Sequence, residues 1–170
     1  MELLDPVPDF NLYEEYWKIY TNSGALPPEY ISENAVVRKS IISNGCEVYG
    51  EVHNSVLGAG VVIGKGTVVK DSIIMENTII GENCIIDKAI IADEVKVGDD
   101  VTMGIGADVP NKVKPNIYSF GLVTIGEKSV IPSKVQIGKN TAVSGKTVNA
   151  DYVNGVLESG ETLIKAGDQA

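Results

Sequence analysis

Large aliphatic residues recur every six positions over most of the chain, and a smaller residue lies two positions before each of them. In residues 55–71 the large positions are Leu57, Ile63 and Val69, and the small ones are Ser55, Val61 and Thr67. Residues two apart on a strand share a face. Each unit of six therefore predicts a short strand with two inward side chains and a corner after it, and three units make one triangular turn.

The pattern also repeats every 17 residues without a gap, so that Leu57, Ile74 and Ile91 share one column. The three full repeats cover residues 55–71, 72–88 and 89–105. Residues 40–54 begin the same way but form a turn two residues shorter. Stacked turns share parallel hydrogen bonds at roughly 4.8 Å spacing. The sequence thus predicts an all-β fold, a parallel β-helix of hexapeptide repeats with 17–18 residues per turn.

The repeat is interrupted once and then resumes. Residues 106–121 contain two prolines and break the period, which predicts a loop projecting from the prism. The period returns at Ile125, and Val153, Val156 and Leu163 predict one weaker final turn. The expected domains are a linker over 1–34, a β-helix over 35–165 and a frayed tail over 166–170.

The first thirty residues carry a different pattern. Residues 5–8 read Asp-Pro-Val-Pro and are expected to be extended. Asn11 can cap a short helix over 12–20, where aromatic residues fall at helical spacings, and Pro27 and Pro28 end this segment. Because half of the chain's ten aromatic residues lie between Phe10 and Tyr20, we expect this linker to pack against a core or an interface.

Composition narrows the function classes. The chain has 170 residues, 44% of them hydrophobic, with 22 Val and 19 Ile against 8 Leu, as expected of short strands. A net charge of −9 argues against a nucleic-acid partner. No apolar run approaches the ~18 residues that span a bilayer, and the N-terminus lacks the features of a signal peptide. We therefore expect a cytoplasmic protein without membrane contact, in which Cys46 and Cys84, on different sides of the prism, are buried free thiols.

One outward row is unusually apolar. Between each inward pair one side chain points outward, and on one side of the prism these are Ile41, Val56, Ile73 and Ile90. Leaving an isoleucine exposed forgoes roughly 1.5–3 kcal/mol of burial. This row predicts an interface with another subunit or another domain. The alternative is strand propensity on a solvated face.

Candidate chemistry is sparse. His53 is the single histidine, so no metal site and no catalytic residue are predicted from histidine clusters. A lone histidine can act as the general base of an acyltransferase on this fold, or can be an exposed structural residue. Five lysines of the loop and the later turns can hold a phosphorylated metabolite by charge-assisted hydrogen bonds, or can be ordinary solubilising charge. These candidate effector-binding residues are Lys112, Lys114, Lys128, Lys139 and Lys146.

Several segments resemble a known family, bacterial glucose-1-phosphate adenylyltransferase (ADP-glucose pyrophosphorylase). The linker words are Asp5-Pro6-Val7-Pro8, Asn11-Leu12-Tyr13, Trp17 to Thr21 and Pro27-Pro28, and the first β-helix turns match at Ser40 to Ser43, Gly45-Cys46, Gly50 and Asn54 to Leu57. The resemblance covers essentially the whole chain and is to the C-terminal β-helix part of that enzyme. It implies a left-handed helix, a feature that the periodicity does not determine.

The resemblance also implies a division of labour. In that family a nucleotide-binding domain precedes this linker, and ATP and Mg²⁺ are implied only for that domain, so we expect no cofactor in this chain and no activity from it alone. The implied role is regulation and oligomerisation, with a homo-oligomer or the enzyme's catalytic domain as partner and a phosphorylated metabolite as effector. The alternatives are a stand-alone hexapeptide-repeat acyltransferase and a structural paralogue that binds the full enzyme.

Overall fold

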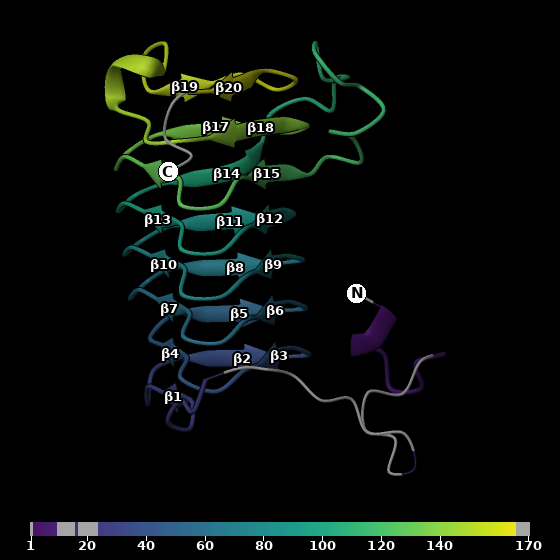
Figure 1. Cartoon of the computed structure of the whole chain (residues 1–170), viewed down its shortest axis with the longest axis vertical. Helices are drawn as coiled ribbons and strands as arrows, with labels where there is room; N and C mark the ends of the chain where they lie inside the picture. Colours follow the sequence, from purple (N-terminus) through teal and green to yellow (C-terminus); the bar gives the residue numbers. More distant parts are fainter. Residues whose placement is uncertain (1, 10–15, 17–23, 166–170) are drawn as a thin grey trace.

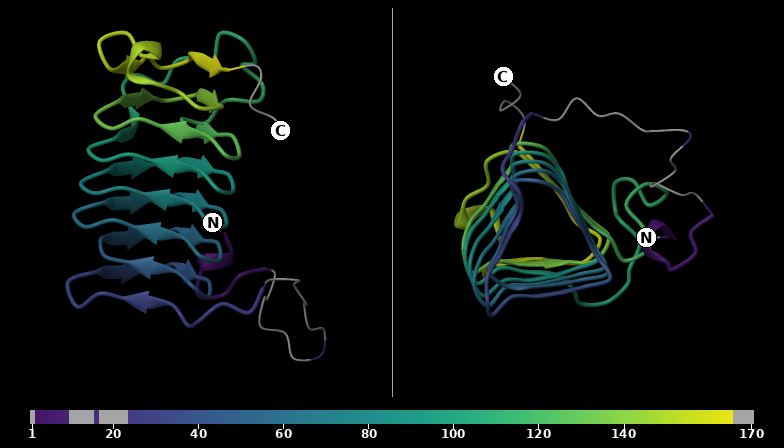
Figure 2. Two further views of the ribbon diagram at one scale, coloured as in Figure 1. Left: turned by 60° about the vertical axis from the view of Figure 1, so that its left-hand side comes forward. Right: turned by 90° about the horizontal axis from the view of Figure 1, so that it is seen from below.

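From residue 30 onward the chain winds into a triangular prism of stacked turns (Figures 1 and 2). The computed structural model describes residues 2–9, 16 and 24–165. Short parallel strands form the three sides, which confirms the expected all-β parallel β-helix. The left-handed sense stays a prediction. The expected helix over 12–20, except Tyr16, and the expected tail over 166–170 lie outside the described residues.

Each side of the prism is one parallel sheet. Sheet A contains β1 (Tyr30–Ile31), β4 (Glu47–Val48), β7 (Val62–Ile63), β10 (Ile79–Ile80), β13 (Lys96–Val97) and β16 (Val130–Ile131). Sheet B contains β2 (Val36–Arg38), β5 (Glu51–His53), β8 (Val68–Lys70), β11 (Ile85–Asp87), β14 (Thr102–Ile105), β17 (Gln136–Gly138) and β19 (Val156–Leu157). Sheet C contains β3 (Ile41–Ile42), β6 (Val56–Leu57), β9 (Ile73–Ile74), β12 (Ala89–Ile91), β15 (Val123–Ile125), β18 (Thr141–Ser144) and β20 (Thr162–Ile164).

Two short 3-10 helices, η1 (Glu2–Leu4) and η2 (Asn149–Asp151), lie outside the sheets. The first strand, β1, begins at Tyr30, within the segment that the sequence assigned to the linker. The three corners are named here by the sheets they connect, in chain order: AB, BC and CA.

The predicted columns are stacked side chains. Leu57 pairs with Ile74, and Ile74 pairs with Ile91, in successive strands of sheet C. All three side chains are fully buried. The same register continues to Ile125 in β15, so the interior of the prism is one continuous apolar core.

The small inward positions are often polar because they bind the backbone of neighbouring turns. Ser72 Oγ donates to Lys70 O at 2.6 Å and accepts a hydrogen bond from Ala89 N at 3.0 Å. Thr67 Oγ1 donates to Gly81 O at 2.6 Å. A buried backbone group without a partner costs roughly 1–3 kcal/mol. Serine and threonine at these positions therefore fill the corner and satisfy it.

The short first turn has a simple structural cause. Only Tyr49 and Gly50 separate β4 from β5, whereas residues 64–67 separate β7 from β8. A Cβ atom at Gly50 would lie 2.2 Å from Thr67 O. Glycine is required at this AB corner because the tightened chain passes directly against the next turn.

Glycine is not general at the corners, contrary to the expectation from the repeat. One position of the CA corner has a positive φ in successive turns, at Gly45 (75°), Gly60 (70°), Asn77 (54°), Glu94 (56°) and Lys128 (54°). The N–H of Asn77 donates to Ala59 O at 2.9 Å, and the N–H of Glu94 donates to Glu76 O at 2.9 Å. Hydrogen bonding between stacked corners holds this backbone conformation whichever side chain occupies it.

The interrupting segment leaves the prism at the BC corner (Figure 1). The register between β14 and β17 shifts between Met103 and Ile105, a β-bulge that bends the chain outward. The chain returns to the prism at β15. In the weaker last turn only β19 and β20 remain as strands, with Leu157 facing inward and Val153 largely exposed.

Candidate functional site

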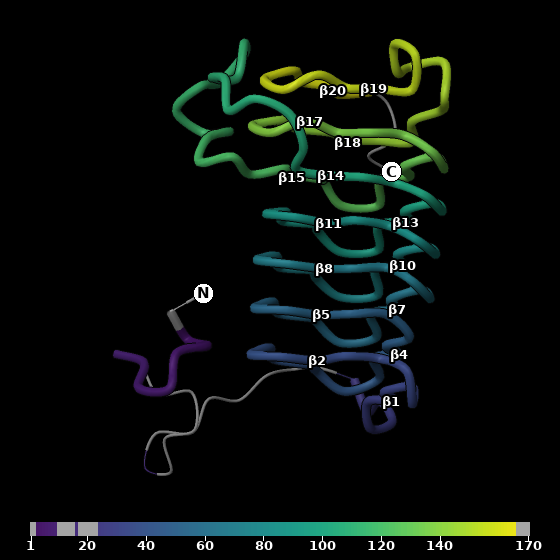
Figure 3. The backbone as a smooth tube through the Cα atoms, turned by 180° about the vertical axis from the view of Figure 1, so that it is seen from behind, coloured from purple at the N-terminus to yellow at the C-terminus, as the bar shows by residue number. Residues whose placement is uncertain are grey.

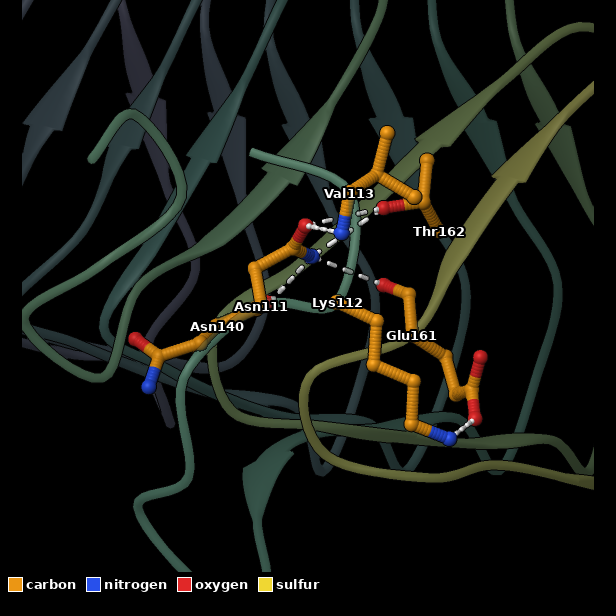
Figure 4. A network of polar contacts seen from close by, with 6 residues as sticks. All are labelled: Asn111, Lys112, Val113, Asn140, Glu161 and Thr162. Carbon is orange, nitrogen blue, oxygen red and sulfur yellow. Dashed lines mark hydrogen bonds and ion pairs between the residues drawn. The ribbon is translucent and has the colours of Figure 1, made fainter. Parts of the chain in front are cut away.

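Two buried asparagine side chains anchor the loop 106–122 to the prism. Asn111 is 2% exposed. Its Nδ2 donates to Asn140 O at 2.9 Å and to Thr162 Oγ1 at 3.0 Å. Its Oδ1 accepts hydrogen bonds from the N–H groups of Val113 at 2.9 Å and Lys114 at 2.8 Å (Figure 4). One amide therefore holds the tip of the loop against β20.

Asn140 holds both ends of the same loop. Its Nδ2 donates to Asp108 Oδ1 at 2.6 Å and to Val109 O at 2.7 Å, and its Oδ1 accepts from Gly121 N at 2.7 Å. Ala142 faces outward on β18 yet is only 5% exposed, because the loop covers this end of sheet C. The loop projects from the corner, as the sequence predicts, but it is fixed in place by contacts that the sequence analysis missed.

Three of the five predicted lysines gather beside this loop, at the BC corner. Lys112 forms an ion pair with Glu161 (Figure 4). The N–H of Lys112 donates to Gly160 O at 2.8 Å, and the N–H of Gly160 donates to Lys139 O at 2.8 Å. Lys114 lies two residues further along the loop and is exposed.

The other two predicted lysines, Lys128 and Lys146, lie at the CA corner in successive turns. Lys146 is bridged to Val130, the strand residue that follows the corner of Lys128. A third lysine joins them from the last turn: Lys165 N donates to Ser144 O at 3.0 Å, and its Nζ lies 2.6 Å from Asp151 Oδ2. Its spacing of 19 residues from Lys146, close to one turn, was the signal that could have identified it.

The structure thus divides the predicted effector residues between two corners, and the five lysines do not form a single site. Both groups lie at the same end of the prism (Figure 3). Residues 106–165 carry seven lysines and five acidic residues, whereas residues 24–105 carry six basic and twelve acidic residues. The end that holds the loop is therefore the electropositive part of an acidic chain, which favours anions there.

The predicted interface residues form one row. Ile41, Val56, Ile73 and Ile90 are in register on neighbouring strands of sheet C, and all four are half-buried. Charged residues interrupt the corresponding outer rows, with Glu47 and Lys96 on sheet A and Glu51 on sheet B. An uninterrupted apolar row is thus specific to sheet C in these turns, and what covers it stays a prediction.

The remaining candidates have defined surroundings. His53 Nε2 lies 3.0 Å from Glu51 Oε2 on the outer face of β5. Cys46 and Cys84 are buried and unpaired, as predicted, and burial raises the pKa of both thiols. No group of three or more histidine, cysteine and acidic residues among the described residues is placed to hold a metal ion. Over the part of the chain that the structure covers, no helix is long and apolar enough to cross a membrane.

Fold and repeat together define a hexapeptide-repeat β-solenoid. The profile of the family described as GlmU-like, C-terminal hexapeptide, matches residues 28–125, and the chain belongs to this family. A solved hexapeptide transferase family protein from Anaplasma phagocytophilum is 13% identical, with a TM-score of 0.49 over 81% of this chain and 74% of that one.

Curated relatives carry a more particular name. Glucose-1-phosphate adenylyltransferase of Lachnospira eligens is 66% identical over 168 residues, which are 99% of this chain and 40% of that protein. The enzymes of that name from Acetivibrio thermocellus and Thermosipho melanesiensis are 44% and 55% identical, over 99% and 91% of this chain and 39% and 38% of their own length. The resemblance seen in the sequence is confirmed. The chain spans about two fifths of the length of these relatives and corresponds to their C-terminal part.

Proposed function

We propose that this chain is the regulatory and assembly part of a glucose-1-phosphate adenylyltransferase, which converts ATP and glucose 1-phosphate to ADP-glucose and pyrophosphate in cytoplasmic glycogen synthesis. The observation that carries the proposal is the 66% identity over 99% of this chain to a protein of that name. Because the match spans 40% of that relative, the binding of ATP and Mg²⁺ is assigned to the rest of the enzyme.

The assembly role rests on the outer row of sheet C. Four branched aliphatic side chains in register form a flat ladder, and covering each one contributes roughly 1.5–3 kcal/mol if burial becomes complete. Rows of this kind on the surface mark interaction sites. The partner is a second copy of the chain or the catalytic domain of the same enzyme.

The regulatory role rests on the two lysine groups at the electropositive end. Ammonium groups hold phosphate through charge-assisted hydrogen bonds. Lys112 and Lys139 flank the backbone of Gly160, and Lys128 and Lys146 occupy successive turns. A phosphorylated metabolite at either group would bind to a surface that the anchored loop or the last turn keeps rigid, with little ordering cost.

The enzymatic part of the proposal is tested on the purified chain. We expect no release of pyrophosphate from ATP, Mg²⁺ and glucose 1-phosphate, because the groups that transfer the adenylyl moiety are assigned outside this chain. A coupled pyrophosphate assay on an equal amount of a full-length relative is the positive control. Turnover by the chain itself would overturn this assignment.

The assembly role is tested by sedimentation velocity at micromolar concentration. We expect an oligomer for the wild-type chain and a shift to monomer for Ile73→Glu, because the new carboxylate would be buried without a partner. Ile85→Glu, on the outer face of sheet B, is the matched control and should leave the oligomer intact. A monomeric wild-type chain would leave the catalytic domain as the occupant of the row, which co-purification with that domain would then show.

A second function has one observation in its favour. The hydrogen bond between His53 and Glu51 would orient an imidazole for general-base catalysis in a stand-alone acyltransferase. In that case coenzyme A should raise the melting temperature of the chain, and His53→Ala should abolish acetyl transfer. An unchanged melting temperature with coenzyme A would exclude it. A structural paralogue would instead co-purify with a longer catalytic chain.

A further inference from the structure

A basic row runs across the first turns, at the opposite end of the prism from the lysine groups. Arg38, His53 and Lys70 are the last residues of β2, β5 and β8, and the register pairs Arg38 with His53 and His53 with Lys70. All three side chains face outward from sheet B, since the residue before each of them points inward. Arg38 is the single arginine of the chain, and His53 is the single histidine.

The cations at the two ends of this row have no partner. Within residues 2–9, 16 and 24–165, neither the Arg38 guanidinium nor the Lys70 ammonium forms an ion pair. The imidazole between them is held by Glu51 at 3.0 Å. Asp87 is the next residue of the row and bounds it beyond Lys70. The row is thus open toward Arg38 and closed by a carboxylate at the other end.

The same edge already holds one carboxylate from a distant part of the chain. Lys39, the residue after Arg38, binds Asp5 through a contact of 2.8 Å between Nζ and Oδ1. Both side chains of this pair are about half exposed, so the contact is a weak one. It shows that an anionic group reaches this corner although the chain carries a net charge of −9.

We propose that the row Arg38–His53–Lys70 is a binding site for a small oxyanion, the phosphoryl or carboxylate group of a metabolite. Adjacent strands lie about 4.8 Å apart, so the three side chains span about 10 Å. The guanidinium can hold one oxyanion in a bidentate manner, while the ammonium and an imidazole N–H donate from the neighbouring strands. The site is separate from the lysine groups of the late turns and does not depend on the proposed regulatory function.

The single histidine makes the test direct. In a ¹H–¹⁵N spectrum of the imidazole nitrogens, the only side-chain histidine signals are those of His53. Titration of the chain with inorganic phosphate, and separately with citrate, should shift these signals in a saturable way, with a dissociation constant on the order of 1 mM. Saturation by phosphate alone assigns the site to phosphoryl groups, and saturation by citrate alone assigns it to carboxylates. If neither anion gives a saturable shift up to about ten times that concentration, the proposal is overturned.

Matched variants separate this site from general electrostatics. Arg38→Gln should weaken the binding seen at His53 by about tenfold or more. Lys96→Gln removes the same charge from the outer face of sheet A, and Lys139→Gln removes it from the BC corner of the late turns. Both should leave the titration unchanged. An equal loss in all three variants would show that only net charge matters and would overturn the proposal. If Arg38→Gln melts at a lower temperature, Lys70→Gln replaces it as the test variant.

Discussion

The early turns, residues 30–105, and the late turns, residues 123–165, share one backbone repeat but use it differently. In the early turns every full repeat has 17 residues, and the small inward hydroxyls bind the backbone of the adjacent turn. The late turns are bordered and interrupted by two excursions, residues 106–122 and 145–155. The difference shows that one repeat can build a uniform scaffold and, further along the same axis, a platform for irregular polar structure.

The interior changes along with the outline. In the late turns a buried hydrogen bond of 2.8 Å joins Thr147 Oγ1 to Tyr152 Oη, and burial raises the pKa of that tyrosine. Asn111 and Asn140 are also buried there. Polar groups fully paired inside a protein specify one arrangement, whereas aliphatic columns tolerate exchange. The late turns should therefore be the more specific and the less stable region.

The largest expected effect tests the scaffold. Ile74→Ala, in the early part of the sheet C column, should lower the free energy of unfolding by about 3–4 kcal/mol, because it leaves a cavity in a fully buried site. Leu163→Ala, in the last turn of the same column, should cost about half as much, since Leu163 is only partly buried. Urea unfolding followed by circular dichroism measures both, and equal losses would contradict the contrast between the regions.

The next effect tests the platform. Asn111→Ala should cost about 1–3 kcal/mol, because buried partners of the amide lose their hydrogen bonds. The loss should be local, with faster proteolytic cleavage within residues 106–122 and unchanged hydrogen exchange in the early turns. Asn116→Ala, an exposed position of the same loop, is the control. Uniformly faster exchange throughout the prism would argue against a separate platform.

The smallest effect concerns pH. The ion pair with Lys165, together with the N–H of Val148, holds the pKa of Asp151 below its ordinary value of 3.8. A lowered pKa in the folded state means that this contact stabilises the protein above that value and is lost as the pH falls through the folded pKa. Asp151→Asn should therefore lower the melting temperature slightly at pH 7, and the difference from wild type should vanish below about pH 4. A difference that persists at pH 3 would contradict this cause.

The scaffold was predictable from the sequence because its interactions are periodic. The column of Leu57, Ile74 and Ile91, and the alternation around it, follow from spacing alone, and the structure confirms them. The corners were predicted less well. The expectation of glycine fails at Asn77 and Glu94, because the stacked neighbours, not the residue type, impose the positive φ there.

The platform could not be predicted, because its contacts have no period. Asn111 reaches Asn140 and Thr162, which lie 29 and 51 residues further along the chain. The lysines Lys112 and Lys128 were grouped by their proximity in sequence, yet they lie at different corners. The sheet to which each residue belongs, not its sequence distance from the next lysine, decides which cations meet. Lys165 was missed for the same reason.

The way the loop joins the prism shows how such a chain can change. After the excursion β15 still pairs with β12, with Ile90 opposite Thr124, so the partners are 34 residues apart instead of 17 and the ladder is otherwise unaltered. A corner is therefore a place where the polypeptide can lengthen without shifting the alignment of any rung. Evolution can add or replace recognition segments at such positions while the inherited column of aliphatic side chains stays the same.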